Sequence, residues 1–286
     1  MAFDHGRIPG NLIDTYKRGK AAIFVGAGAS GGAGLPNWGK FLEALVDHGQ
    51  KQSVVTEDKA KEYLQLIKDP AKYLMVASGL KDDLGNYFSE IIEKTFKDPK
   101  PKPTELHSAL VKLDNLPFVL TTNYDTIIER AYRAEVDDDV SVLTYKDEGE
   151  LQRRLFKHEF FILKAHGDAQ RTGNGIILTE RDYREILYRQ RAYQHLLTGM
   201  FSMFSIVFVG ASMNDPEMRL LLNYIADAYP QDSGPNHYAA MAKEEITSVE
   251  QERWFKDLKV QLIPISKDNN YAELTEFLVA LREAAA

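Results

Sequence analysis

Two side chains of this sequence, Asn123 and His166, could do acid–base and positioning chemistry. His166 follows a short apolar run and is flanked by Gly167 and Asp168. An imidazole with a pKa of about 6.5 accepts a proton at neutral pH, and a positioned general base contributes roughly 10²–10⁴-fold in rate. Asn123 stands where another apolar run gives way to a helical pattern. Its amide could cap that helix or orient a hydroxyl group or a water molecule, and both interpretations are open.

A glycine-rich segment could bind phosphate groups. Residues 26–31, GAGASG, fit the pattern G-x-G-x-x-G directly after an apolar run. Backbone amides at the start of a helix attract anions, and glycines let a pyrophosphate approach the chain closely. A dehydrogenase would add an acidic residue about 20 positions later, at the end of the next strand. The sequence around Asp47 has a helical pattern instead, so we expect either a dinucleotide held in another way or glycines that only make a tight turn.

The apolar runs predict the elements that position these residues. Four runs are typical of strands buried on both faces, at 21–25, 118–122, 160–164 and 205–209. Weaker strands are expected at 176–178, 237–241 and 260–265. Strands that alternate with helical patterns predict an α/β fold, a Rossmann-like doubly wound parallel sheet.

Helical patterns fill most of the remaining chain. A helix is predicted to begin at Trp38 with Asn37 as its N-cap and to end before Gly49. Residues from about 50 to 116 show helical periodicity without a convincing strand. We therefore expect one domain over residues 1–286 with a helical insertion, a small domain, at approximately 50–116. Pro216 is expected at the first position of a later helix.

The polar segments all follow predicted strands. They are residues 26–30, 123–125, 166–168 and 210–214. Open α/β sheets bind ligands in the crevice beyond the carboxyl ends of their strands. We therefore expect these four segments to converge on one crevice.

Composition narrows the classes of partner. The 286 residues carry 35 basic and 42 acidic side chains, a net charge of −7, which does not favour direct binding to nucleic acid or to a membrane. The absence of cysteine excludes thiolate zinc sites and fits a reducing compartment. Residues 1–10 lack the apolar core of a signal peptide, and the most apolar stretch, 200–213, is shorter than the ~20 residues of a membrane span. We expect a cytoplasmic protein.

Four motifs in one order resemble the sirtuin family. They are residues 26–30 (GAGAS) with 33–36 (AGLP), 121–125 (TTNYD), 164–168 (KAHGD) and 208–215 (FVGASMND). More specifically, they resemble the bacterial branch of sirtuin-like NADases found in antiphage defence systems. The resemblance extends from about residue 12 to residue 270.

The resemblance implies an NAD-binding Rossmann domain and a reaction at the bond between nicotinamide and ribose. It assigns the general base to His166 and the positioning of ribose and water to Asn123. It places NAD against Gly26, Ala27, Gly28, Ser30, Asn37, Trp38, Thr122, Asp125, Gly210, Ser212 and Asn214.

Two departures from the family pattern bear on the reaction. Deacylase sirtuins carry a four-cysteine zinc ribbon, and this chain has no cysteine, so no zinc is expected. Their Gly-Ile-Pro-Asp-Phe-Arg segment is replaced by residues 34–39, GLPNWG, without the Asp and Arg. Without an acyl-lysine the available acceptor is water, which predicts an NAD⁺ hydrolase that releases nicotinamide and ADP-ribose.

Two other functions stay open. One is an NAD-dependent protein deacylase or ADP-ribosyltransferase, and the other is a non-catalytic sensor of NAD or ADP-ribose. Defence effectors of this kind are usually silent until triggered. The resemblance therefore implies a homo-oligomer, or a separate sensor or ATPase/Argonaute-type partner protein.

Overall fold

The strands of the chain form one parallel sheet. The computed structural model describes residues 3–97, 101–136, 139–171, 175–213, 215–229 and 233–286. Within them seven strands pair in parallel in the order β3-β4-β2-β1-β5-β6-β7. Their bounds are β1 Ala21–Val25, β2 Phe118–Thr121, β3 Val142–Thr144, β4 Phe161–Lys164, β5 Ser205–Val209, β6 His237–Ala242 and β7 Val260–Ile265.

The central strand explains the apolar runs. Every residue of β1 is buried, between β2 on one side and β5 on the other. Ile23 and Val25 belong to the apolar core on one face of the sheet, whereas Ala22 and Phe24 belong to the core on the opposite face. Because successive side chains of a strand point to opposite faces, a strand that is covered twice must be apolar at every position.

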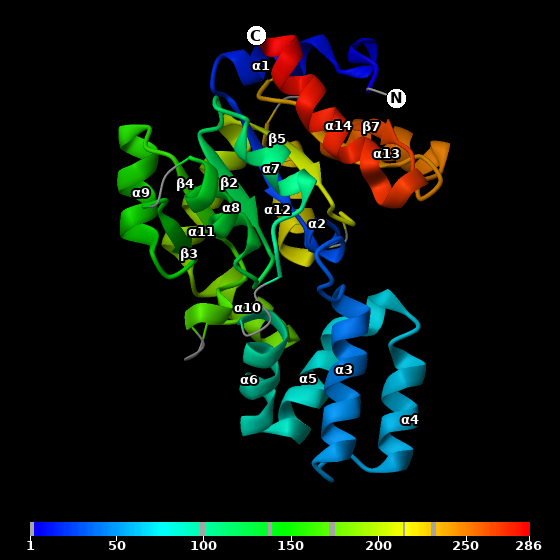
Figure 1. Ribbon diagram of the computed structural model, residues 1–286. Helices are drawn as coiled ribbons and strands as arrows, with labels where there is room; N and C mark the ends of the chain where they lie inside the picture. Colours follow the sequence, from blue (N-terminus) through cyan, green and yellow to red (C-terminus); the bar gives the residue numbers. More distant parts are fainter. Residues whose placement is uncertain (1–2, 98–100, 137–138, 172–174, 214, 230–232) are drawn as a thin grey trace.

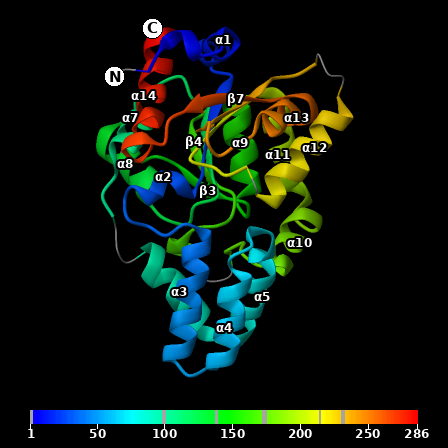
Figure 2. The same ribbon diagram turned by 90° about the vertical axis from the view of Figure 1, so that its right-hand side faces the viewer.

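Helices cover both faces of the sheet (Figures 1 and 2). The first core packs against α1 Gly10–Lys17, α7 Glu105–Val111, α8 Ile127–Glu135 and α14 Asp268–Ala285, which is kinked at residues 269–271. The second packs against α9 Glu148–Lys157, α10 Glu180–Tyr188, α11 Arg191–Met203, α12 Pro216–Ala228 and α13 Ser248–Leu258. This arrangement confirms the Rossmann-like α/β fold. No helix among the described residues has the length and apolar character to span a bilayer.

The four strong strand predictions are confirmed to within one residue, and the weaker ones at 237–241 and 260–265 are also correct. The strand expected at 176–178 is wrong. Those residues are extended but add no strand to the sheet, and the Ile177 amide instead donates to the carbonyl oxygen of His166 at 2.9 Å. The edge strand β3 was not predicted; it has three residues, and the first of them is only partly buried.

A separate group of helices lies beyond the carboxyl edge of the sheet, at the bottom of Figures 1 and 2. It contains α3 Trp38–Lys51, α4 Glu57–Leu66, α5 Tyr73–Leu84 and α6 Asn86–Ile92, packed around a third apolar core. Short helical turns occupy His5–Arg7, Pro70–Lys72, Glu93–Lys97 and Ala169–Arg171.

The start of α3 is as predicted and its end is not. The Asn37 side chain accepts a bond from the Lys40 amide at 3.0 Å and caps the helix. Gly49 was expected to follow the helix but lies inside it. A Cβ atom there would stand 2.5 Å from a methyl group of Val55, so this glycine serves close packing rather than helix termination.

Candidate active site

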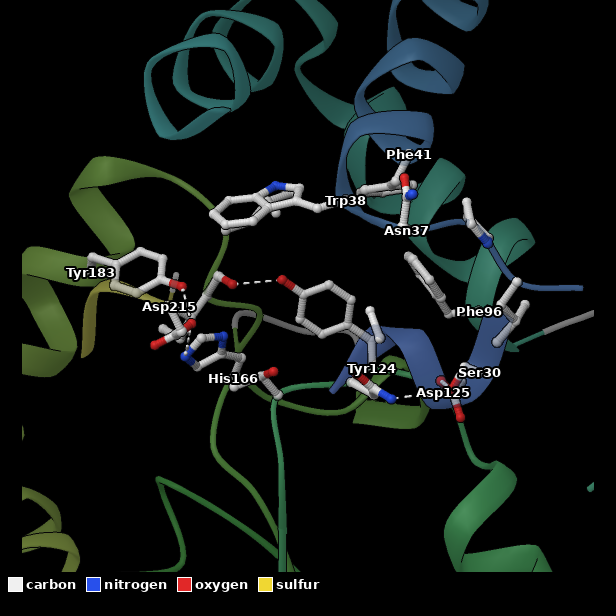
Figure 3. A pocket seen from close by; sticks show the side chains of 17 residues that line it. Ser30, Asn37, Trp38, Phe41, Phe96, Tyr124, Asp125, His166, Tyr183 and Asp215 are labelled. Carbon is white, nitrogen blue, oxygen red and sulfur yellow. Dashed lines mark hydrogen bonds and ion pairs between the residues drawn. The ribbon is translucent and has the colours of Figure 1, made fainter. Parts of the chain in front are cut away.

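A cavity opens where the carboxyl ends of the central strands face the α3 helix (Figure 3). Its wall includes residues from three of the four polar segments and from the start of α3. Of the predicted site residues, the cavity is lined by Ala27, Ser30, Asn37, Trp38, Thr122, Asn123, Asp125 and His166.

The predicted glycines lie behind this wall. The cavity is not lined by Gly26, Gly28 or Gly210, nor by the predicted site residue Ser212. Asn214 lies outside the described residues. The Gly26 and Gly28 amides donate to the carbonyls of Val209 and Gly210, both at 2.9 Å. A Cβ atom on Gly28 would lie 2.8 Å from the Gly210 oxygen. Here the first two glycines of the pattern let the loops after β1 and β5 pack backbone against backbone.

The Gly-rich loop also differs in shape from the expected one. Its residues enter the five-residue helix α2 Ala27–Gly31 directly after β1, with Gly26 as the N-cap. This brings Ser30, on the last turn of α2, beside the loop that follows β2.

Asn123 is anchored on two sides. Its Nδ2 atom donates to the Gly26 carbonyl and to Ser30 Oγ, each at 3.1 Å, and Ser30 Oγ donates to Asp125 Oδ2 at 2.8 Å. Asp125 Oδ1 accepts from the Ile127 amide at 2.9 Å, so Asp125 rather than Asn123 binds the first turn of α8. Of the two interpretations of Asn123, helix capping is therefore not what its side chain does.

A buried lysine supports this loop from below. Lys164 Nζ donates to the carbonyls of Tyr124 and Asp125, at 3.1 and 2.5 Å, and contacts the carboxylates of Glu129 and Asp168, each at 3.0 Å. Burial alone would lower the pKa of Lys164, but the two carboxylates outweigh it and the pKa is raised. The ammonium group therefore stays charged and ties the Asn123 loop to β4. A lysine that ends a strand buried on both faces was the available signal for this role.

His166 is 3% exposed and faces two acidic side chains at the start of α12. Its Nε2 atom lies 3.4 Å from Glu217 Oε2 and 3.5 Å from Asp215 Oδ2. Tyr183 donates to Asp215 at 2.8 Å and packs edge-on against the imidazole. Burial lowers the pKa of His166, but Asp215 and Glu217 together raise it above its ordinary value.

The sequence pattern did not single out Glu217. It occupies the first turn of a helix that begins with proline, where an acidic residue is common because of the helix dipole. Only the fold shows that its side chain turns inward to His166.

Aromatic side chains line the upper wall of the cavity and stand in its middle. Figure 3 shows the Tyr124 ring between His166 on one side and Ser30 and Asp125 on the other, below Trp38. The Tyr124 hydroxyl donates to the Ile177 carbonyl at 2.6 Å. The cavity thus offers aromatic surface for a planar ring, an oriented amide and an imidazole. Among the described residues, no group of three or more histidine, aspartate and glutamate side chains is arranged to hold a metal ion.

This chain resembles a SIR2-like domain family and several proteins named NAD(+) hydrolases. The family model of the SIR2-like domain matches residues 117–263. NAD(+) hydrolase ThsA of Bacillus cereus (strain MSX-D12) is 28% identical over 271 residues, which are 90% of this chain and 53% of that protein. ThsA of Acinetobacter baumannii (strain 532279) is 26% identical over 81% of this chain and 44% of its own length. Defense-associated sirtuin 2 of Bacillus subtilis is 23% identical over 75% of this chain and 20% of its length. The chain thus spans about half the length of the NAD(+) hydrolases it matches, or less.

Proposed function

Because the chain belongs to the SIR2-like domain family, we propose that it hydrolyses NAD⁺ to nicotinamide and ADP-ribose as an NAD-depleting effector of bacterial antiphage defence. The names of its relatives support this activity. The observation that carries the proposal is that Asn123 and His166 line one cavity together with Ser30 and Trp38.

The reaction makes modest demands on the site. The bond between the ribose C1′ and the nicotinamide nitrogen breaks, and nicotinamide leaves as a neutral ring that needs no proton. The electron-poor ribose carbon then bonds to the oxygen of water, and the proton of that water passes to His166. Catalysis consists of stabilising the positive charge on the ribose and placing the water, which falls to the Asn123 amide. The imidazole finally releases its proton to solvent.

The lining of the cavity suits this substrate. Trp38 and Tyr124 present aromatic surface to the nicotinamide ring. Ala27 and Ser30, the latter hydrogen-bonded to Asn123, are proposed to face the ribose. We place the remaining contacts of the nicotinamide riboside at Asn37, Thr122 and Asp125. Ser212, exposed after β5, is proposed for the adenosine side. Gly26, Gly28 and Gly210 contribute by holding the two loops together.

We further propose that the protein works in the cytoplasm as a homo-oligomer or with a separate sensor or ATPase/Argonaute-type partner. Leu220 and Tyr224, one turn apart on α12, are 51% and 59% exposed and offer apolar area for such contacts. Light scattering after size-exclusion chromatography measures whether the chain associates with itself.

Chromatography of the reaction products tests the proposed activity. NAD⁺ is incubated with a concentration series of the protein, and nicotinamide and ADP-ribose are expected in equal amounts. His166→Ala should lower the formation of both products by about two to four orders of magnitude, whereas His195→Ala, at an exposed position of α11, should form them at the wild-type rate. Nicotinamide release that requires an added acylated peptide would instead indicate a deacylase. Binding of NAD⁺ without turnover at every concentration would indicate a sensor, and either result overturns the proposal.

A further inference from the structure

A fully buried carboxylate stands beside His166. Glu217, in the first turn of α12, has no exposed surface. Its Oε1 atom accepts a hydrogen bond from Gln194 Nε2 at 2.5 Å, and its Oε2 atom lies 3.4 Å from His166 Nε2. Burying a carboxylate is unfavourable by several kcal/mol unless it is paired. The position of Glu217 therefore makes physical sense through its two partners, Gln194 and the imidazole.

Asp215 and Glu217 both lie near the same nitrogen of the imidazole, Nε2. Asp215 Oδ2 lies 3.5 Å from Nε2 and is itself held by the Tyr183 hydroxyl. Two carboxylates beside Nε2 favour a proton on that atom, because each is an acceptor only. Since a neutral imidazole carries one proton, Nδ1 is then the unprotonated nitrogen. Figure 3 shows the ring with Nε2 toward Asp215 and its other edge toward the middle of the cavity.

We propose that Glu217 is a positioning residue for His166: its carboxylate keeps the proton on Nε2 and leaves Nδ1 to accept the proton of the attacking water. Glu217 touches neither the water nor NAD⁺ and acts through the imidazole alone. This assignment rests on the proposed NAD⁺ hydrolysis and adds to it the atom that takes the proton.

The charges around the imidazole make the assignment measurable through pH. The titratable groups that face His166 are Asp215 and Glu217 at the start of α12, Tyr183 from α10 and Tyr124 after β2. Tyr193 from α11 interacts with the two carboxylates. Burial raises the pKa of all three tyrosines, so they remain neutral near pH 7. The two carboxylates are therefore the groups that stabilise the imidazolium. Removing the charge of Glu217 lets His166 lose its proton at lower pH.

The rate of NAD⁺ hydrolysis against pH gives the first test. We expect the acidic limb of the wild-type profile to lie above pH 6.5, the ordinary histidine value, and to move to lower pH in Glu217→Gln. Groups that orient a reacting histidine are worth about 10–100-fold in activity, so kcat falls by that factor while KM for NAD⁺ stays within about twofold. Glu252→Gln, at an exposed position of α13, leaves the profile unchanged. A profile of Glu217→Gln that overlays the wild type contradicts the proposal.

Nitrogen-15 NMR of histidine-labelled protein gives a second test that needs no activity. The His166 signal is identified by its loss in His166→Ala. Above its titration, wild-type His166 should show a protonated Nε2 and an unprotonated Nδ1, and Glu217→Gln should show a mixture of tautomers. Should Glu217→Gln fail to fold, Gln194→Ala removes only the anchor of the carboxylate and should give a smaller change of the same kind. A proton on Nδ1 in the wild type overturns the assignment whether or not the protein hydrolyses NAD⁺.

Discussion

The side-chain amide of Asn123 donates a hydrogen bond to the hydroxyl of Ser30 at 3.1 Å, and that hydroxyl in turn donates a hydrogen bond to Asp125 Oδ2 at 2.8 Å. One hydroxyl thus orients the proposed water-positioning amide and satisfies the carboxylate that begins α8.

Ser30→Ala removes both bonds at once. Each net hydrogen bond contributes about 0.5–1.5 kcal/mol, so the free energy of unfolding should fall by about 1–3 kcal/mol. NAD⁺ turnover should fall roughly tenfold, because Asn123 keeps only its bond to Gly26. Urea unfolding and turnover are compared with Ser202→Ala, whose hydroxyl bonds only within α11. Equal turnover in the two variants would show that Ser30 does not orient Asn123.

Lys164→Met tests the support beneath the loop. The substitution leaves Glu129 and Asp168 buried without their cation, and breaking a buried ion pair in this way is destabilising by about 3–5 kcal/mol. The matched control is Lys51→Met on α3, where the exposed pair with Asp47 contributes at most about 0.5 kcal/mol. Urea unfolding measures both. A Lys164→Met protein within 1 kcal/mol of the wild type would be evidence against the network.

Two glycines of the same motif should respond in opposite ways to alanine. At Gly28 the new methyl group would meet the Gly210 carbonyl, so the free energy of unfolding should fall by about 1–3 kcal/mol. Gly31 has no atom within 4 Å of the Cβ position, and alanine in its helical turn should be neutral or stabilising by up to ~1 kcal/mol. Thermal unfolding distinguishes them. Destabilisation of the same size at both positions would contradict the packing role of Gly28.

Acid should destabilise the protein through His237. Burial, aided by Lys259, lowers the pKa of this side chain from 6.5 to about 3, and its Nδ1 atom accepts the Ile206 amide at 3.2 Å. Below pH 6.5 His237 is protonated in the unfolded chain but stays neutral in the folded chain. The contribution of His237 to the free energy of unfolding is therefore fully present above pH 6.5 and falls by about 1.4 kcal/mol per pH unit down to about pH 3.

His237→Asn keeps an acceptor for the Ile206 amide and removes the titration. Its free energy of unfolding should depend less steeply on pH than that of the wild type between pH 6 and 4. Urea unfolding at a series of pH values gives both slopes. If they are the same, His237 is not the group responsible.

The strands were predictable because a strand that is buried on both faces must be apolar at almost every position, as β1 and β5 are. The segment at 176–178 misled for the same reason. Ile177 and Leu178 are buried and line the cavity, but neither pairs with a strand: Ile177 belongs to the second core of the sheet, and Leu178 belongs to the core of the separate group of helices. The local sequence indicates that a residue is buried, but it does not indicate which residues it packs against.

The site was predictable where each residue follows a strand, as with Asn123 and His166. Glu217 and Lys164 were not assigned roles. A lysine at the end of a buried strand was a signal for Lys164, but the partners of both side chains lie on elements distant in sequence, such as α11 and the loop after β2. The glycine motif was found correctly. Its Gly26 and Gly28 pack against the loop after β5, about 180 residues away, and no local sequence pattern reveals that contact.

The most direct test of the account compares the NAD⁺ turnover of Asn123→Ala, His166→Ala and their double variant with that of two exposed controls, Asn223→Ala and His195→Ala. Each site variant should lose about two to four orders of magnitude, or about 3–5 kcal/mol of transition-state stabilisation. The double variant should lose less than the sum, because the two side chains act on one reaction centre. Unchanged NAD⁺ consumption by both single variants would contradict the assignment of the active site.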